Sequence, residues 1–274
     1  MSIVPRRTRA WAGAALAVAT LASVVPLLGQ SSAGLKPRPT TQPRPTTEAR
    51  RPDFSGYWAA GRAFRASEKD PSPLPPNTVM LNDAGAIELP SGNFGGLKVK
   101  PAALAAALKW KPADDMTLSK ACQPQSIVYT MQGPFPFEID QATELIVMRL
   151  EYYDIVRVIY LDGRSHPPPD APHTKVGHSV GRWDGNTLIV DTTHISASTI
   201  LNNGLDHGDK VHLIERFWLS ADGKTLMARQ EFEDPDVLEN RGARLVAWDR
   251  QTGEHIYPYE CDPTFVLNYS PSKK

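Results

Sequence analysis

The feature that most constrains the fold is a succession of strand-like segments with no helix of crossover length between them. From about Ile127 onward, apolar and polar residues alternate with a period of two, which is typical of strands with one buried face. Four hairpins are predicted, over 144–151 with 155–161, 177–194, 211–219 with 225–233, and 243–248 with 255–261. Strands joined locally pair as antiparallel neighbours. We therefore predict an all-β fold with one or two short helices, an antiparallel meander that closes into an up-and-down barrel; a two-sheet sandwich is the alternative.

The clearest hairpin spans residues 177–194 and has Asp184-Gly185 at its centre. Asp-Gly supplies the positive φ angles that a two-residue hairpin turn needs. Such a turn at this dipeptide would place His178 directly opposite Asp191, and an imidazole beside a carboxylate can serve as an acid/base pair. A three-residue turn would shift the register by one and separate the two side chains. A His and an Asp that merely decorate a solvent face are the alternative.

The N-terminal part of the chain indicates export. Within residues 1–33, three arginines precede an apolar run from Trp11 to Leu28, and Ser31-Ser32-Ala33 offers small residues for cleavage, as in a secretory signal peptide. Residues 34–53 are Pro-rich and have almost nothing to bury, so we interpret them as an extended linker. A single β-barrel domain is predicted from residue 54 to residue 274. We expect a periplasmic or secreted protein.

The charge balance argues against nucleic acid as a partner. The chain has 30 basic and 30 acidic residues, and loss of the three signal-peptide arginines leaves 27 minus 30, or about −3. No basic stripe remains that could follow a phosphate backbone. The apolar run of the signal is short and lacks a charged stop-transfer flank, so we expect no membrane span after cleavage. An uncleaved membrane anchor is the alternative.

The two cysteines, Cys122 and Cys261, both lie in the part of the chain that is predicted to be exported, where thiols can be oxidised. We expect one disulfide that ties the start of the core to its last strand. In the loop-entropy model a closure of this length contributes about 5 kcal/mol. Two buried free thiols are the alternative, and a zinc site is disfavoured because neither cysteine belongs to a C-x-x-C pair.

Glu215 is the most unusual single position. Alternation within 211–219 puts this carboxylate on the apolar inner face of its strand, where it costs several kcal/mol unless it is paired or protonated. One interpretation is a general acid or base with a raised pKa that faces a cavity. The other is a structural ion pair, for which Arg157 is the candidate partner because it also lies on the apolar face of its strand.

Five of the seven histidines fall within residues 166–207. If the loops of the barrel converge, His166, His178, His194 and His207 could meet at one mouth and bind a metal or transfer protons. No H-x-H or H-E-x-x-H pattern is present, so we predict no metal site and no cofactor. Ser179 matches the letters G-x-S-x-G, but a strand follows it rather than the helix of a hydrolase elbow, so it is not predicted to be a nucleophile.

A series of short motifs runs through most of residues 54–261. They are Cys122-x-Pro124, Phe135-Pro136-Phe137-Glu138-Ile139, Arg157-x-Ile159-Tyr160-x-Asp162-Gly163-Arg164-x-His166-Pro167, Gly177-x-Ser179-x-Gly181-x-Trp183-x-Gly185-x-Thr187-Leu188-x-Val190-Asp191-Thr192, Glu215-Arg216-Phe217 and Glu260-Cys261. In this order they resemble a family of exported bacterial β-rich proteins, and the motif around Trp183 is the specific one. The resemblance implies export and a β-rich fold and carries over no catalytic residue.

Gly56 and Trp58 on the first strand resemble the Gly-x-Trp pattern of lipocalin-type barrels, in which the indole closes the base of the barrel. A barrel of this size can enclose a ligand-sized cavity. We therefore predict a protein that binds a small apolar or aromatic molecule in its interior. The expected ligand-binding residues are Trp58, Arg157, Trp183 and Phe217.

Two other functions remain open at this stage. One is a cofactor-independent acid/base enzyme, a lyase, isomerase or hydrolase, with Glu215 or the pair of His178 and Asp191 as catalytic residues. The other is a structural envelope protein, which would have a filled barrel and no pocket. The long loop 196–209 is a possible lid over the barrel mouth.

Overall fold

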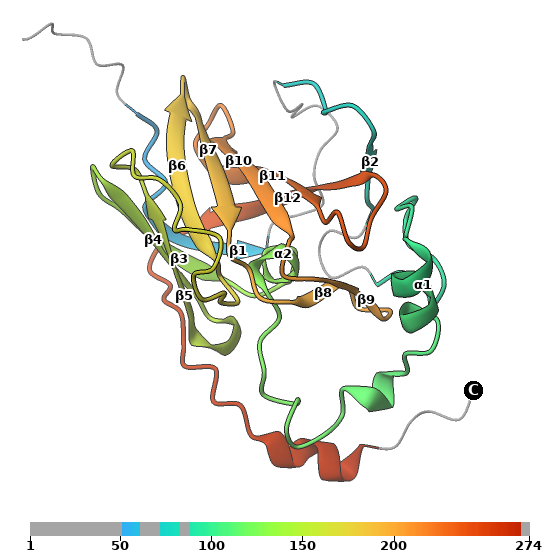
Figure 1. Cartoon of the computed structure of the whole chain (residues 1–274). Coiled ribbons are helices and arrows are strands. Elements are labelled where there is room, and N and C mark those ends of the chain that lie inside the picture. Colours follow the sequence, from blue (N-terminus) through green and yellow to red (C-terminus); the bar gives the residue numbers. More distant parts are fainter. Residues whose placement is uncertain (1–50, 61–71, 83–87, 270–274) are drawn as a thin grey trace, which may run out of the picture. The chain divides into compact units, whose positions relative to one another are not determined.

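The computed structural model describes residues 51–60, 72–82 and 88–269 (Figure 1). All of them belong to one contact unit, residues 47–274. The predicted signal peptide and residues 34–50 of the predicted linker lie outside the described residues. Within those residues, no helix combines the length and the apolar character that a membrane crossing requires.

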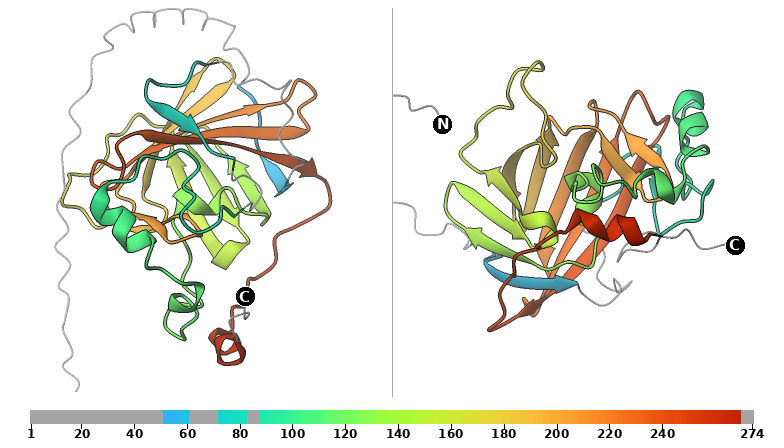
Figure 2. Two further views of the ribbon diagram at one scale, coloured as in Figure 1. Left: turned by 90° about the vertical axis from the view of Figure 1, so that its right-hand side faces the viewer. Right: turned by 90° about the horizontal axis from the view of Figure 1, so that it is seen from below.

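Nine strands form a closed barrel, which confirms the predicted fold class (Figures 1 and 2). Their order is β1-β3-β4-β5-β6-β7-β10-β11-β12, and β12 pairs back with β1 to close the sheet. The bounds are β1 Gly56–Ala60, β3 Phe137–Gln141, β4 Leu145–Leu150, β5 Ile155–Tyr160, β6 His178–Asp184, β7 Thr187–Thr193, β10 His212–Leu219, β11 Thr225–Glu233 and β12 Arg241–Gln251. Three of the four predicted hairpins are present.

Two pairings depart from a simple meander. β5 and β6 run parallel and pair at Ile159 with Ser179. The long connection 161–177 makes this possible, because it returns the chain to the end of the barrel at which β5 began. A tenth strand, β2 (Thr78–Met80), pairs in parallel with the start of β12.

The fourth predicted hairpin is wrong, because residues 255–261 form no strand. β12 already has β11 on one side, and on the other side it pairs with β2 near its start and with β1 near its end. Among the described strands, only residues 244–247 of β12 lack a partner on that side, which is too short an edge for the predicted hairpin of 243–248 with 255–261. The segment instead runs along the outside of the barrel, where the backbone of Tyr259 donates to Asp154 at 3.2 Å and its ring stacks on Tyr153.

The elements outside the barrel are short. The helices are α1 (Pro101–Ala107) and α2 (Ile127–Thr130), and the 3-10 turns are η1 (Pro112–Asp114), η2 (Tyr152–Asp154) and η3 (Pro263–Asn268). The predicted loop 196–209 contains a hairpin, β8 (Ser198–Leu201) with β9 (Leu205–His207), which packs against α1 and α2 (Figure 2). This packing makes the segment part of the fold rather than a free lid.

The disulfide between Cys122 and Cys261 is confirmed, with the two Cα atoms 5.8 Å apart. It joins the stretch before α2 to the stretch before η3, not to a last strand as expected. The two cysteines are 139 residues apart in sequence. The bond therefore fixes the C-terminal segment, which has no sheet pairing of its own, to the body of the barrel.

Side chains fill the barrel interior. The inward-facing residues of β7, β10 and β11 alternate with outward-facing ones, and those facing inward are almost completely buried. The apolar ones are exposed by no more than 2%: Leu188, Val190, Leu213, Phe217, Leu226, Ala228 and Phe232. This packing stabilises the barrel and sets which residues of each strand face outward, toward the candidate site.

Candidate functional site

The central hairpin has a different register from the predicted one. Gly185 and Asn186 form the two-residue loop, Asp184 pairs with Thr187, and Gly185 takes the positive φ of +56°. The register is therefore two residues away from that of an Asp184-Gly185 turn. A shift of two preserves the faces of the strands. His178 and Asp191 both stay on the outer face, although they are not directly opposite each other.

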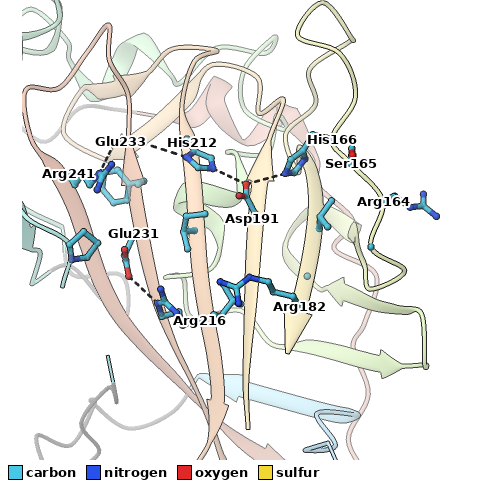
Figure 3. A pocket seen from close by; sticks show the side chains of 17 residues that line it. Arg164, Ser165, His166, Arg182, Asp191, His212, Arg216, Glu231, Glu233 and Arg241 are labelled. Carbon is cyan, nitrogen blue, oxygen red and sulfur yellow. Dashed lines mark hydrogen bonds and ion pairs between the residues drawn. The ribbon is translucent and has the colours of Figure 1, made fainter. Parts of the chain in front are cut away.

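A cleft of about 590 Å³ opens on the outer face of the sheet, over β6, β7, β10, β11 and β12 (Figure 3). The connection between β5 and β6 forms one wall with residues 163–166, and Pro75 lies on the opposite side. Outward-facing Val180, Ile189 and Ile214 provide an apolar floor. The larger set of polar residues around the floor is Arg164, Ser165, His166, Arg182, Asp191, His212, Arg216, Glu231, Glu233 and Arg241.

Asp191 joins two histidines at one end of the cleft (Figure 3). Its Oδ1 accepts hydrogen bonds from His166 Nε2 at 3.2 Å and from His212 Nε2 at 2.8 Å. Partial burial alone would raise the pKa of Asp191, but the hydrogen bond from His212 and the nearby imidazoles lower it below its ordinary value. The carboxylate is therefore ionised near neutral pH, and both Nε2 atoms must carry hydrogen because a carboxylate only accepts.

The contact with Asp191 favours the charged form of His212. The hydrogen bond to Asp191 raises its pKa above the ordinary value, and the charge of Glu233 adds to this effect. His212 Nδ1 lies 3.7 Å from Glu233 Oε1, and Arg241 Nε donates to Glu233 Oε2 at 2.5 Å. A row of alternating basic and acidic side chains therefore runs from Arg241 through Glu233 and His212 to Asp191 along the edge of the cleft.

His178 contacts His166 through their Nδ1 atoms, which are 3.0 Å apart. One of these atoms must accept, so the two rings cannot both be imidazolium ions while the contact lasts. Burial lowers the pKa of His178, and the charges of His166 and Arg164 lower it further. Its ring also stacks on Tyr160, with centroids 5.3 Å apart. His178 thus links the wall of the cleft to the barrel in its neutral form.

Arginines dominate the other end of the cleft. Arg182 on β6 and Arg216 on β10 are both paired in register with Ile189 of β7. Figure 3 shows the Arg182 side chain extending across β7 toward Arg216. Ile189 faces outward and yet is only 6% exposed, as expected if the arginine stems cover it.

The two arginines at this end differ in their partners within the described residues. Arg216 Nε lies 3.5 Å from Glu231 Oε1, and the same oxygen is 2.6 Å from Arg229 Nη2. Arg182 has neither a hydrogen bond nor an ion pair with any residue that the structure describes. The guanidinium group of Arg182 is therefore available, among the described residues, to an anion from solution.

Glu215 is paired inside the barrel, as the structural interpretation predicted. Its carboxylate forms an ion pair with Arg157, and both residues are 0% exposed. Gln230 Nε2 donates to Glu215 Oε1 at 3.0 Å. Arg157 also donates to Ser179 Oγ at 3.2 Å and to Thr192 Oγ1 at 3.0 Å. Ser179 is thus a buried acceptor for Arg157.

The other expected ligand-binding residues are part of the packing. Trp58 and Phe217 are exposed by 0% and 2% and lie in the hydrophobic core. Trp183 is half-buried and packs on Phe54, with ring centroids 5.2 Å apart. None of these three, nor Arg157, lines the outer cleft.

The histidines meet only in part. His166 and His178 come together, whereas His207 is buried in β9 beside Ser126 Oγ at 2.7 Å and His194 contacts Pro168 O at 2.9 Å. No metal-binding group of three or more His, Cys, Asp or Glu side chains occurs in the described part of the chain. Sequence analysis missed His212, although alternation along 211–219 places it on the face opposite to Glu215.

Comparisons of the chain with protein-family models, with curated proteins and with solved structures found no match. The resemblance to exported β-rich proteins, which rests on short motifs, stays a prediction. The cleft is therefore characterised by its own residues: a carboxylate between two imidazoles at one end, two guanidinium groups at the other, and an apolar floor between them.

Proposed function

We propose that the protein binds a small molecule with an acidic group in the cleft on the outer face of the barrel. The observation that carries the proposal is the pair of arginines, Arg182 and Arg216, above Ile189 at one end of an apolar floor. The interior site predicted from the sequence has less support, because Trp58 and Phe217, which were expected to line it, are packed in the hydrophobic core.

The chemistry of the two parts of the cleft favours an amphipathic anion. A guanidinium group presents several N–H donors in one plane and binds a carboxylate through two parallel hydrogen bonds. The floor of Val180, Ile189 and Ile214 offers apolar contact area to the body of the same molecule. Partial enclosure by the walls strengthens the electrostatic attraction relative to an open surface.

Titration calorimetry of the purified protein with benzoate, and with benzamide as its neutral isostere, tests this proposal. We expect benzoate to bind at least about tenfold more tightly, since an ion pair replaces a neutral hydrogen bond. R182Q should abolish the difference. R149Q, the same change on the opposite side of the barrel where Arg149 pairs with Glu138, should not. Equal binding of the two compounds, or an R182Q variant that keeps the difference, would contradict the proposal.

Acid/base catalysis is the second candidate function, and the arrangement of Asp191 with two imidazoles favours it. A carboxylate that orients an imidazole is the basis of many acid/base sites. Exchange of the α-hydrogens of phenylacetate into D2O, followed by NMR, tests this candidate. Exchange that occurs only when the protein is present, and that is lost in H212Q, would support catalysis.

If no small acid binds at all, the structural role in the envelope becomes the leading interpretation.

A further inference from the structure

We infer that the bound molecule is a hydroxylated aromatic acid, which lies flat on the floor with its acid at Arg182 and Arg216 and its hydroxyl group at Asp191. This inference rests on the proposed function, because it names the class of ligand for the same cleft. Three features of the cleft support it: the distance between the two ends, the shape of the floor and the charge at the Asp191 end.

The distance between the ends suits one ring. Asp191 and Ile189 are two residues apart on β7, which corresponds to about 7 Å along a strand. Ile189 is the residue between the two arginines, whereas Asp191 lies between Val180 and Ile214 in the register of the sheet. In a benzene ring that carries an acid group and a hydroxyl group in the para position, the distance between these two groups is comparable.

The floor suits a flat molecule. Val180, Ile189 and Ile214 project from three neighbouring strands of one sheet face, and their branched side chains form a continuous apolar surface. The walls at residues 163–166 and at Pro75 confine the molecule from two sides. An aromatic ring buries most of its apolar area in such a slot and loses little conformational entropy, because it has few rotatable bonds.

The Asp191 end selects a neutral hydrogen-bond donor. Oδ1 of Asp191 already accepts two hydrogen bonds, while Oδ2 accepts none from any residue that the structure describes. The Asp191 side chain is 45% exposed, and a carboxylate oxygen can only accept, so Oδ2 is the acceptor that we assign to the ligand. A second acid on the ligand would be repelled there.

An ammonium group is also disfavoured at this end. Asp191 already has His166 and His212 as partners, and Glu233 is paired with Arg241. Each carboxylate at this end therefore has a basic partner, so a ligand ammonium group would lose its hydration for little net attraction. A neutral hydroxyl group loses less hydration and still donates a hydrogen bond to Asp191, so it is the best match among common donors.

A matched set of para-substituted benzoates tests the inference by calorimetry. We expect 4-hydroxybenzoate to bind about 10-fold or more tightly than benzoate, because a hydrogen bond to an ionised acceptor is among the strong ones. 4-Methoxybenzoate, which cannot donate, and 4-(aminomethyl)benzoate, which carries an ammonium group, should not exceed benzoate. In D191N the ratio of the benzoate and 4-hydroxybenzoate dissociation constants should fall below about threefold, and in R149Q it should stay as in the wild type.

The outcomes separate this inference from the proposed function. If benzoate and 4-hydroxybenzoate bind equally and both depend on Arg182, the ligand class is wrong and the acid-binding site stands. If neither binds, both proposals fail. If D191N binds none of these compounds, the carbon-13 chemical shift of the Asp191 carboxylate is measured in the wild-type protein instead. A change in this chemical shift on addition of 4-hydroxybenzoate, but not of benzoate, supports the inference. Equal changes with the two compounds overturn it.

Discussion

Two charged clusters lie back to back across the same strands. β10 carries Glu215 toward the interior and His212 toward the outer cleft, and β7 carries Thr192 inward and Asp191 outward. Both clusters combine carboxylates with cations and hydrogen bonds. They differ in exposure: Arg157 and Glu215 are completely buried, whereas the side chains of Asp191 and His212 are 45% and 36% exposed.

This difference separates a structural role from a binding role. The interior pair is surrounded by protein partners, so its charges mainly satisfy each other and offer nothing to a ligand. The outer cluster keeps a free carboxylate oxygen at Asp191 and an unpaired guanidinium group at Arg182 within the part of the chain described. A carboxylate in a strand therefore tells little about function until the exposure of its remaining hydrogen-bonding atoms is known.

The largest effect is expected from breaking the interior pair. E215Q leaves the Arg157 guanidinium buried without its counter-charge, and we expect a loss of about 3–5 kcal/mol in the free energy of unfolding. Urea denaturation followed by tryptophan fluorescence measures it. Replacement of both partners, in R157M/E215M, should recover most of the loss because no charge then remains to be buried.

The exposed pair of Arg149 and Asp140, with side chains exposed by 44% and 63%, provides the control for this prediction. D140N removes a carboxylate of the same kind and should cost less than about 1 kcal/mol, since solvent screens the interaction. An E215Q variant as stable as D140N would show that burial does not distinguish the two clusters.

A smaller effect is expected at the outer cluster. D191N should lower the free energy of unfolding by less than about 1 kcal/mol, because water screens a pair that is more than one third exposed. If D191N destabilised the protein as much as E215Q, the outer cluster would be structural too, and the proposed contact of a ligand hydroxyl group with Asp191 would lose its support.

The contribution of Asp191 and His212 to the free energy of unfolding depends on pH, and the direction follows from their pKa shifts. The pKa of His212 is raised in the folded state, so its contribution is full below the ordinary value of 6.5 and is lost as pH rises through the folded value. The pKa of Asp191 is lowered, so its contribution is present above the ordinary 3.8 and is lost as pH falls through the folded value. The stability difference between wild type and D191N should therefore be largest between about pH 4 and 6.5 and shrink outside this range. A difference that is constant from pH 4 to 9 would contradict the assignment.

The smallest effect is expected in the wall of the cleft. The pKa of His178 is lowered by burial and by the charges of His166, Arg164 and His194, so its stabilising contribution is present above pH 6.5 and is lost as pH falls through the folded value. If the rings of His178 and His166 were both protonated, neither Nδ1 atom could accept and the contact between them would break. His166 would keep its Nε2 hydrogen bond to Asp191.

Hydrogen exchange of the backbone amides in residues 162–177, corrected for intrinsic rates, measures this release. We expect protection to fall several-fold between pH 7.5 and 5, with little change in β10 and β11. H255Q, a change at an exposed histidine, should behave like the wild type. Unchanged protection over this range would mean that the two rings do not control the wall.

Much of the fold could be predicted from local patterns. The period of two along 211–219 and 225–233 predicted β10 and β11 together with their inward faces. The same pattern placed Glu215 and Arg157 on apolar faces, and the need to pair a buried carboxylate pointed to their contact. The segment 255–261 was predicted wrongly because strand formation there depends on a free sheet edge, which no local pattern reveals.

The candidate site was less predictable. His178 and Asp191 were singled out, but His166 joins them from the connection between β5 and β6, and His212 joins from β10. The parallel pairing of β5 with β6 brings residues 163–166 to the edge of the cleft. The sequence analysis did group His166 with His178, but the parallel crossover that brings them together depends on the whole barrel and has no local signal.

The sequence by itself determined which face of each strand each side chain occupies, because the alternation of side chains in a strand is a local property that survives a register shift of two residues. It also determined that Cys122 and Cys261 were available to each other. Only the tertiary structure decided that the interior is packed, that the space for a ligand lies on the outer face, and that Asp191 lies between His166 and His212. Those facts depend on the closure of the barrel and the path of one long connection, which are set by contacts between residues far apart in the chain.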